Sequence, residues 1–160
     1  MAKRGFDKEL SAFELAVCDA QGDLFEESQY DFECDAFDFI TKFMNSEIAE
    51  SLDKDLSLCH TWGVKQTGET LLSMVDVDRH SGEKYISRDC LRWVGYMYRY
   101  WVWWLGASSK TLIKEVPVNL ACSMYNAYHT LDIEAAIIMF IRAAPGGDAN
   151  DRYVSRVSEA

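Results

Sequence analysis

The stretch from Ser87 to Leu105 constrains the fold most, because aromatic side chains at this density need other elements packed around them. It holds four of the five tryptophans and three of the eight tyrosines. Apolar residues recur along it at helical spacing, and the opposite face mixes cations with aromatic rings. The apolar face consists of Leu91, Val94, Met97 or Tyr98, Trp101 and Leu105, and the mixed face consists of Arg92, Tyr96, Arg99 and Trp103. We therefore expect a helix over 88–105, capped by Ser87 and ended by Gly106.

Helical patterns on both sides of this stretch predict an all-α fold. We expect a single-domain helical bundle of five to seven helices around the central aromatic helix 88–105. A first helix is predicted within 7–18, because Gly22-Asp23 follows it and glycine weakens a helix interior. A second pattern over 31–50 is divided at Ser46, a favourable N-cap residue. No convincing pair of strands is predicted.

The end of the chain changes from helical to polar sequence. Thr130 is expected to cap a last helix over 131–143. We expect an acidic helical domain over residues 1–144 and a flexible C-terminal tail over residues 145–160, whose sequence is polar.

The net charge of −10 lies entirely in the first part of the chain. Residues 1–60 contain 15 acids and 5 bases, whereas residues 61–160 contain 11 of each. The segment from Asp19 to Asp38 has eight acids and no base. Such a charge distribution favours a basic protein partner and disfavours nucleic acid as a direct ligand.

The cysteines and the chain ends favour a reduced, cytoplasmic protein. The five cysteines are an odd number without a close pair, which is typical of buried thiols in a reducing compartment. They are Cys18, Cys34, Cys59, Cys90 and Cys122. No spacing fits a zinc site, so neither a metal nor another cofactor is expected. No signal-peptide pattern or membrane-spanning run is present, so a cytoplasmic location without a membrane partner is expected.

One candidate site is a partner-binding surface made of the mixed helix face and the acidic segment. Its residues are Arg92, Tyr96, Trp103, Glu26, Glu27, Asp31 and Asp35. Arginine, tyrosine and tryptophan dominate interface hot spots, which favours this assignment. The alternative is a central helix buried on nearly all sides. Its arginines would then pair with carboxylates of the acidic segment, for which the candidates are Asp31, Glu33, Asp35 and Asp38. Within this choice we expect Arg99 to be buried and Arg92 to lie at the surface.

Two further groups of residues have chemistry that fits a site. His129 could act as a general base oriented by Asp132, but a role in capping and core hydrogen bonding is the favoured explanation of this segment. Ser108, Ser109 and Lys110 combine hydroxyls, backbone amides and a cation as an anion site does. Helix capping is again the alternative, and the spacing is not that of a P-loop.

Several segments resemble a small, poorly characterised family of bacterial proteins. They are GYMYRYW at Gly95–Trp101, Gly106 with Ser108–Lys110, Tyr125 with HTLD at His129–Asp132 and then Ala136-Ile137, and also Phe39–Ser46. The resemblance covers residues 35–140 and implies an operon that also encodes an ADP-ribosyltransferase-like protein. It therefore implies a toxin–antitoxin or phage-defence setting, but no catalytic residues. Trp103-Trp104 and Val116–Val118 depart from the family's pattern.

Three functional hypotheses follow. The first is a protein-interaction module, an antitoxin that neutralises a basic partner such as an ADP-ribosyltransferase-like toxin. The second is a small enzyme that processes a nucleotide or ADP-ribose, with Arg99, Ser109, Tyr125 and His129 around a pocket. The third is an acidic mimic of nucleic acid that uses residues 19–38. The sequence leaves the oligomeric state open.

Overall fold

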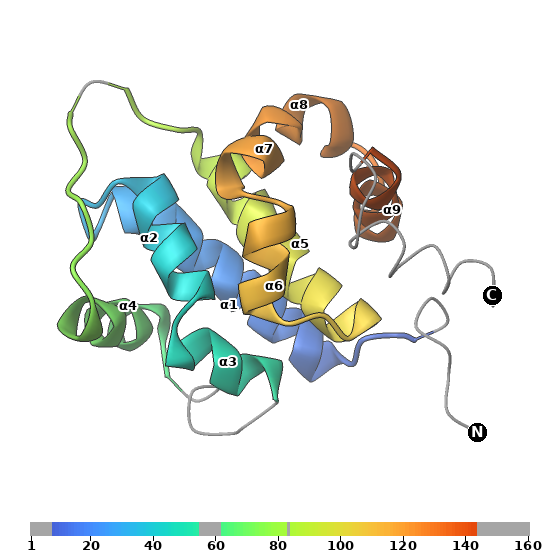
Figure 1. Cartoon of the computed structure of the whole chain (residues 1–160), viewed down its shortest axis with the longest axis horizontal. Helices are drawn as coiled ribbons and strands as arrows, with labels where there is room; N and C mark the ends of the chain where they lie inside the picture. Colours follow the sequence, from blue (N-terminus) through green and yellow to red (C-terminus); the bar gives the residue numbers. More distant parts are fainter. Residues whose placement is uncertain (1–7, 55–61, 83, 144–160) are drawn as a thin grey trace.

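The computed structural model describes residues 8–54, 62–82 and 84–143, and it confirms the all-α bundle. These residues form nine helices and no strand beyond one isolated β-bridge (Figure 1). The helices are α1 (Ala12–Gln29), α2 (Ala36–Met44), α3 (Glu47–Asp53), α4 (Val64–Met74), α5 (Arg88–Leu105), α6 (Ser109–Glu115), α7 (Val118–Ser123), α8 (Tyr125–Tyr128) and α9 (Ile133–Ala143). The predicted tail 145–160 lies outside the described residues.

Local capping signals account for most helix ends. The Ser87 hydroxyl accepts a hydrogen bond from the Cys90 amide at the start of α5, and Gly106 ends that helix with φ 69° and ψ 30°. Ser46 caps α3 as expected, so the pattern over 31–50 becomes α2 and α3. The prediction for Thr130 is wrong, because α9 begins at Ile133 and the carbonyl of Asp132 accepts its first helical hydrogen bond. The described residues form more than the expected five to seven helices, partly because the chain between α5 and α9 forms three short ones, α6, α7 and α8.

The first helix differs from its prediction, because α1 runs through Gly22 to Gln29. A side chain at Gly22 would place its Cβ 2.7 Å from the carbonyl oxygen of Arg92, and one at Gly95 would lie 2.6 Å from the carbonyl oxygen of Gln21. The glycine therefore does not end α1. It lets the backbones of α1 and α5 touch, and these two helices lie against each other as the longest pair of the bundle (Figure 1).

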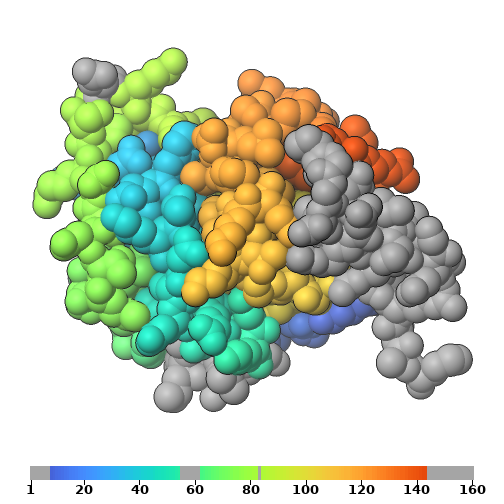
Figure 2. All heavy atoms as spheres, in the orientation of Figure 1, coloured from blue at the N-terminus to red at the C-terminus, as the bar shows by residue number. Residues whose placement is uncertain are grey.

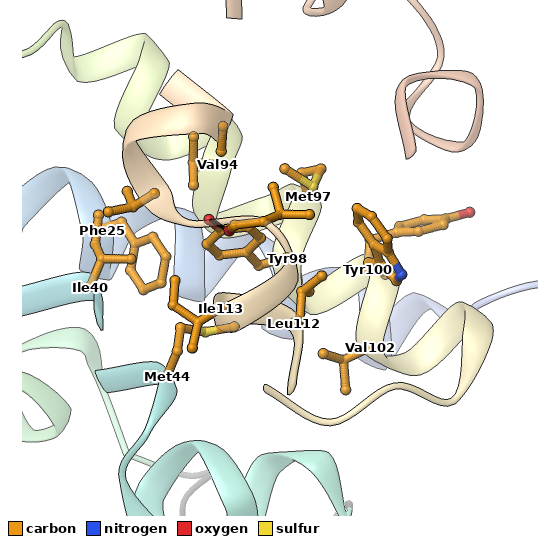
Figure 3. Packing of buried hydrophobic residues seen from close by; sticks show 14 of the residues in the cluster. Phe25, Ile40, Met44, Val94, Met97, Tyr98, Tyr100, Val102, Leu112 and Ile113 are labelled. Atoms are coloured by element: carbon orange, nitrogen blue, oxygen red, sulfur yellow. Dashed lines mark hydrogen bonds between the residues drawn. The ribbon is translucent and has the colours of Figure 1, made fainter. Parts of the chain in front are cut away.

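The core surrounds α5 as the sequence predicts. Besides α1, the helices α6, α7, α8 and α9 pack against α5, and Figure 2 shows α6 and α7 covering one face of the molecule. In Figure 3 the Tyr98 ring of α5 lies beside Phe25 of α1, and the two ring centroids are 6.3 Å apart at 77°. The Tyr98 hydroxyl donates a 2.6 Å hydrogen bond to the carbonyl of Val116. Each such buried aromatic ring stabilises the fold by about 2–3 kcal/mol.

Residues 75–82 and 84–87, which precede α5 and form no helix, hydrogen-bond with the C-terminal end of α1 and the residues after it. The amide of Asp35 donates to the carbonyl of Asp78 at 2.7 Å, and the amide of His80 donates to Glu33 at 3.0 Å. Further along, the side-chain amide of Gln29 exchanges two hydrogen bonds with the backbone of Ile86. This segment connects α4 to α5 and holds α4 close to α1. Within the described ranges, no helix combines the length and hydropathy that a bilayer-spanning segment needs.

Candidate functional site

Arg99, which the enzyme hypothesis places beside a pocket, is a core residue with a partner for each of its three side-chain nitrogens. Its side chain is 0% exposed. Nη1 lies 2.6 Å from Oδ1 of Asp53, and Nε donates to Oε1 of Gln21 at 2.8 Å. Nη2 donates to the Ser109 hydroxyl at 3.2 Å. Burial lowers the pKa of Arg99, and the Asp53 carboxylate opposes that shift. The expected burial is observed, but the expected carboxylate partners are wrong.

Asp53, the last residue of α3, is the carboxylate partner of Arg99. It reaches Arg99 because α3 packs against α6 beside this arginine. The same carboxylate accepts from the amide of Ser109 at 2.8 Å and from its hydroxyl at 2.5 Å. Ser109 is itself fully buried. Ser108 caps α6 by accepting from the amide of Thr111, and Lys110 is exposed. Of the three residues predicted to bind an anion, only Ser109 has a hydrogen bond to an anionic group, and that group is the chain's own Asp53.

The mixed aromatic face of α5 is mostly core. Trp103 is 7% exposed and its indole N–H donates to the carbonyl of Leu52 at 3.0 Å. Tyr96 is half-buried and its ring stacks on Tyr100 with centroids 6.1 Å apart. Assigning Trp103 to an exposed binding face is therefore wrong, because α3 covers that end of α5.

His129 lies at a surface turn after α8. Its Nδ1 is 2.7 Å from the carbonyl oxygen of Tyr125, and its ring stacks on the Tyr125 ring at 4.4 Å. Among the described residues, no hydrogen bond joins His129 to Asp132, and both side chains are exposed. The proposed enzyme residues therefore separate into a buried pair, Arg99 with Ser109, and a surface pair, Tyr125 with His129.

Arg92 lies at the surface, as expected, and forms part of a groove. Its guanidinium is 3.1 Å from Oδ1 of Asp23 and 2.7 Å from Oε2 of Glu26, while its side chain is 54% exposed. The groove encloses about 730 Å³ between α1 and α4, and we call it the α1–α4 groove. Its lining residues are Asp23, Glu26, Glu27, Asp31, Phe32, Val64, Lys65, Glu69 and Arg92.

Four of the seven candidate partner-binding residues thus meet in one place. They are Arg92, Glu26, Glu27 and Asp31. Asp35 has a different role, because its carboxylate caps α2 by accepting from the amide of Asp38 at 2.9 Å. The sequence did not identify Lys65 and Glu69 of α4 as part of this site. No local pattern relates them to α1, since only the fold of the intervening chain brings α4 there.

The groove carries excess negative charge that its own bases do not fully neutralise. Five carboxylates line it against two cations, Lys65 and Arg92. Glu26 is engaged by Arg92 and, at 3.7 Å, by Arg88. Glu27 has a raised pKa, first because it is partly buried and then because the Asp31 carboxyl hydrogen-bonds and repels it. Such a pair gains from an incoming cation.

The acidic segment is less uniform in space than in sequence. Bases from later in the chain pair with several of its acids, as in the 3.3 Å contact of Arg79 with Glu33 and the contacts of Arg88 and Arg92 with α1. Lys42 pairs with Asp38 at 3.0 Å. A continuous row of unpaired carboxylates, which the nucleic-acid mimic requires, is therefore interrupted by arginines.

In the part of the chain that the structure describes, no cluster of three or more histidine, cysteine or acidic residues could hold a metal ion.

No protein-family model, curated protein or solved structure matches the chain.

Proposed function

We propose that the chain is a protein-interaction module that binds a basic segment of another protein in the α1–α4 groove. The observation that carries the proposal is the charge of that groove, where five carboxylates outnumber the two lining cations and the neighbouring Arg88. A net charge of −10 adds a long-range attraction for the same kind of partner. Complementary charge of this kind speeds association and selects the partner.

The chemistry of the groove favours lysine and arginine side chains. Glu27 and Asp31 repel one another, so a cation between them removes an existing cost. Phe32 and Val64 supply apolar surface in the same groove, on which the methylene stem of a lysine or arginine can lie. A phosphate backbone would meet like charge here, so nucleic acid is not the direct ligand.

The resemblance supplies a setting for such an interaction. We infer that the chain acts in the cytoplasm as the antitoxin of a toxin–antitoxin or phage-defence system. Its partner would be a basic protein such as an ADP-ribosyltransferase-like toxin. Neutralisation then requires only that the antitoxin occupy the toxin's basic surface, and no catalytic residue is needed.

Co-expression with the product of the neighbouring gene tests this proposal. Affinity purification through a tag on this chain should recover a complex that raised salt dissociates. The combined substitutions Glu27→Gln, Asp31→Asn and Glu69→Gln should weaken it by about tenfold or more, because they remove charge from the contact itself.

A matched triple variant separates the groove from overall charge. Glu9→Gln, Glu47→Gln and Asp76→Asn remove the same charge from exposed acids outside the groove. This variant should retain affinity within about twofold, since distant exposed charges are screened. Equal weakening by both triples, or a chain that always purifies alone, would contradict the proposal.

A further inference from the structure

Two cysteines that are far apart in the sequence lie together beneath the surface. Cys90 is in the first turn of α5 and Cys122 is near the end of α7, and these two helices pack against each other. Sγ of Cys90 lies 4.0 Å from the carbonyl oxygen of Cys122, to which it donates a weak hydrogen bond. Cys90 and Cys122, which are not a close pair in the sequence, are therefore neighbours in the folded chain.

The two thiols have unequal acidity. The interaction between the two thiols lowers the pKa of Cys90 and, together with burial, raises the pKa of Cys122. Cys90 also occupies the first turn of an 18-residue helix, where backbone amides favour a thiolate. Cys90 is thus the better nucleophile, and Cys122 lies close enough to react with a sulfenic acid formed on Cys90.

The pair lies close enough to solvent for a small oxidant to reach. Cys90 itself is 5% exposed, but Ser87, Arg88 and Asp89 just before it are exposed, and Cys122 is half-buried. Hydrogen peroxide is about the size of a water molecule, so it needs only a narrow approach at this end of α5.

We propose that Cys90 and Cys122 form a redox-active dithiol that a peroxide converts into a disulfide. The Cys90 thiolate attacks one peroxide oxygen, so that an S–O bond forms and the O–O bond breaks; the departing hydroxide takes up the proton that the Cys90 thiol had released and leaves as water. The Cys122 thiol then attacks the Cys90 sulfur, so that the S–S bond forms, the S–O bond breaks and a second water carries away the thiol proton. Overall, two thiols and one hydrogen peroxide give one disulfide and two waters.

Two other cysteines of the chain provide an internal contrast. Burial raises the pKa of the Cys18 thiol to about 12, and burial also raises that of Cys34. Both are buried with no described thiol beside them. They should stay reduced under conditions that oxidise the pair, because thiols without thiolate character react slowly.

The disulfide would tie α7 covalently to the start of α5. It would close the chain between Cys90 and Cys122, a loop that contains most of α5, all of α6 and most of α7. Cross-linking a loop of this length restricts the unfolded chain, so the oxidised protein should unfold at a higher temperature than the reduced protein. This proposal is independent of the partner proposed above.

Peptide mass mapping of the full chain after mild hydrogen peroxide treatment tests the proposal. We expect one cross-linked species that joins the Cys90 and Cys122 peptides, lighter by two hydrogen atoms and reversed by dithiothreitol. Cys122→Ser should leave a sulfenic acid on Cys90 that dimedone captures. Cys90→Ser should leave Cys122 as a free thiol that iodoacetamide alkylates.

Cys59, which lies outside the described residues, needs its own control. Cys59→Ser should form the same cross-link to the same extent. The proposal is overturned if Cys90 and Cys122 remain alkylatable in the oxidised wild-type chain, if the cross-link joins another pair of cysteines, or if it forms only between two chains. Because the mapping uses the wild-type protein, the outcome does not depend on the folding of any variant.

Discussion

Two of the three arginines on α5, Arg92 and Arg99, lie in opposite environments although both pair with acids of the chain. Arg99 and Arg92 are two helical turns apart, yet the Arg99 side chain is 0% exposed and that of Arg92 is 54% exposed. Arg99 has three fixed side-chain partners from three other segments, whereas Arg92 bridges two carboxylates of α1 at the rim of a groove. The difference shows which charges hold the fold together and which remain available to a partner.

The largest effect should follow from removing the carboxylate of the buried pair. Asp53→Ala leaves Arg99 as an uncompensated charge in the core, and it also removes the acceptor at the start of α6. We expect the free energy of unfolding to fall by about 3–5 kcal/mol, measured by urea denaturation.

The matched control is the carboxylate of the exposed pair. Asp23→Ala removes one of the two acceptors of Arg92, and we expect a loss of less than about 1 kcal/mol. Equal losses of unfolding free energy in the two variants would contradict the view that the buried Arg99–Asp53 pair stabilises the fold more than the exposed Arg92–Asp23 pair.

The close contact between α1 and α5 places both arginines beside their partners on α1, and the glycines of this contact can be tested by substitution. Gly95→Val places a Cβ 2.6 Å from the carbonyl oxygen of Gln21, the residue that also binds Arg99. We expect a loss of about 1–3 kcal/mol in thermal or urea unfolding, because backbone atoms cannot move aside cheaply.

Gly63 provides the control for that substitution. A Cβ at Gly63 meets no atom within 4 Å, and its φ of −74° suits any residue. Gly63→Ala should therefore cost less than about 1 kcal/mol, which is the preference for glycine over alanine at the N-cap of α4. A comparable loss at both glycines would argue against a close contact of the two backbones.

Local signals explain what the sequence predicted well. Ser87 and Gly106 bound α5 correctly because a cap depends on residues within one turn of the helix end. The central position of α5 also follows from its own composition, since so many aromatic side chains need neighbours. Gly22 was misread for the complementary reason, because its role depends on Gly95, a residue on another helix.

The candidate site was harder to predict because distant segments build it. The acids of α1 were identified from charge alone, but Lys65 and Glu69 come from α4, whose position depends on the chain between them. Asp53 was overlooked as the partner of Arg99, since a cluster of acids nearer to α1 offered other candidates. Charge composition thus predicts the kind of partner, whereas the pairing of individual side chains within the chain can be assigned only once the fold is known.

A smaller effect is expected at the exposed arginine itself. Arg92→Ala should cost about 0.5–1 kcal/mol in urea unfolding at low salt, and the difference from wild type should shrink in 1 M NaCl because exposed pairs are screened. The loss in Asp53→Ala should persist at the same salt concentration. A salt-independent loss for Arg92→Ala would instead indicate that its packing against α1 dominates.

The smallest effect concerns Glu27, whose pKa lies above its ordinary value of 4.5 because of burial and the nearby Asp31 carboxyl. The folded chain therefore holds this proton more tightly than the unfolded chain, so stability falls as pH rises from 4.5 through the folded pKa. Glu27→Gln should remove that slope and raise stability at pH 7 by about 0.3 kcal/mol, as for other like-charge pairs one helical turn apart.

Glu50 gives the opposite sign, because its bond to Lys54 lowers its pKa. Its contribution is present above pH 4.5 and is lost as the pH falls through the lower folded value, so Glu50→Gln should reduce stability at neutral pH. Urea unfolding of both variants between about pH 2.5 and pH 8 measures the two slopes, because the Glu50 slope lies below pH 4.5 and the Glu27 slope above it. Slopes of the same sign would contradict the view that the groove holds repelling carboxylates for an incoming cation.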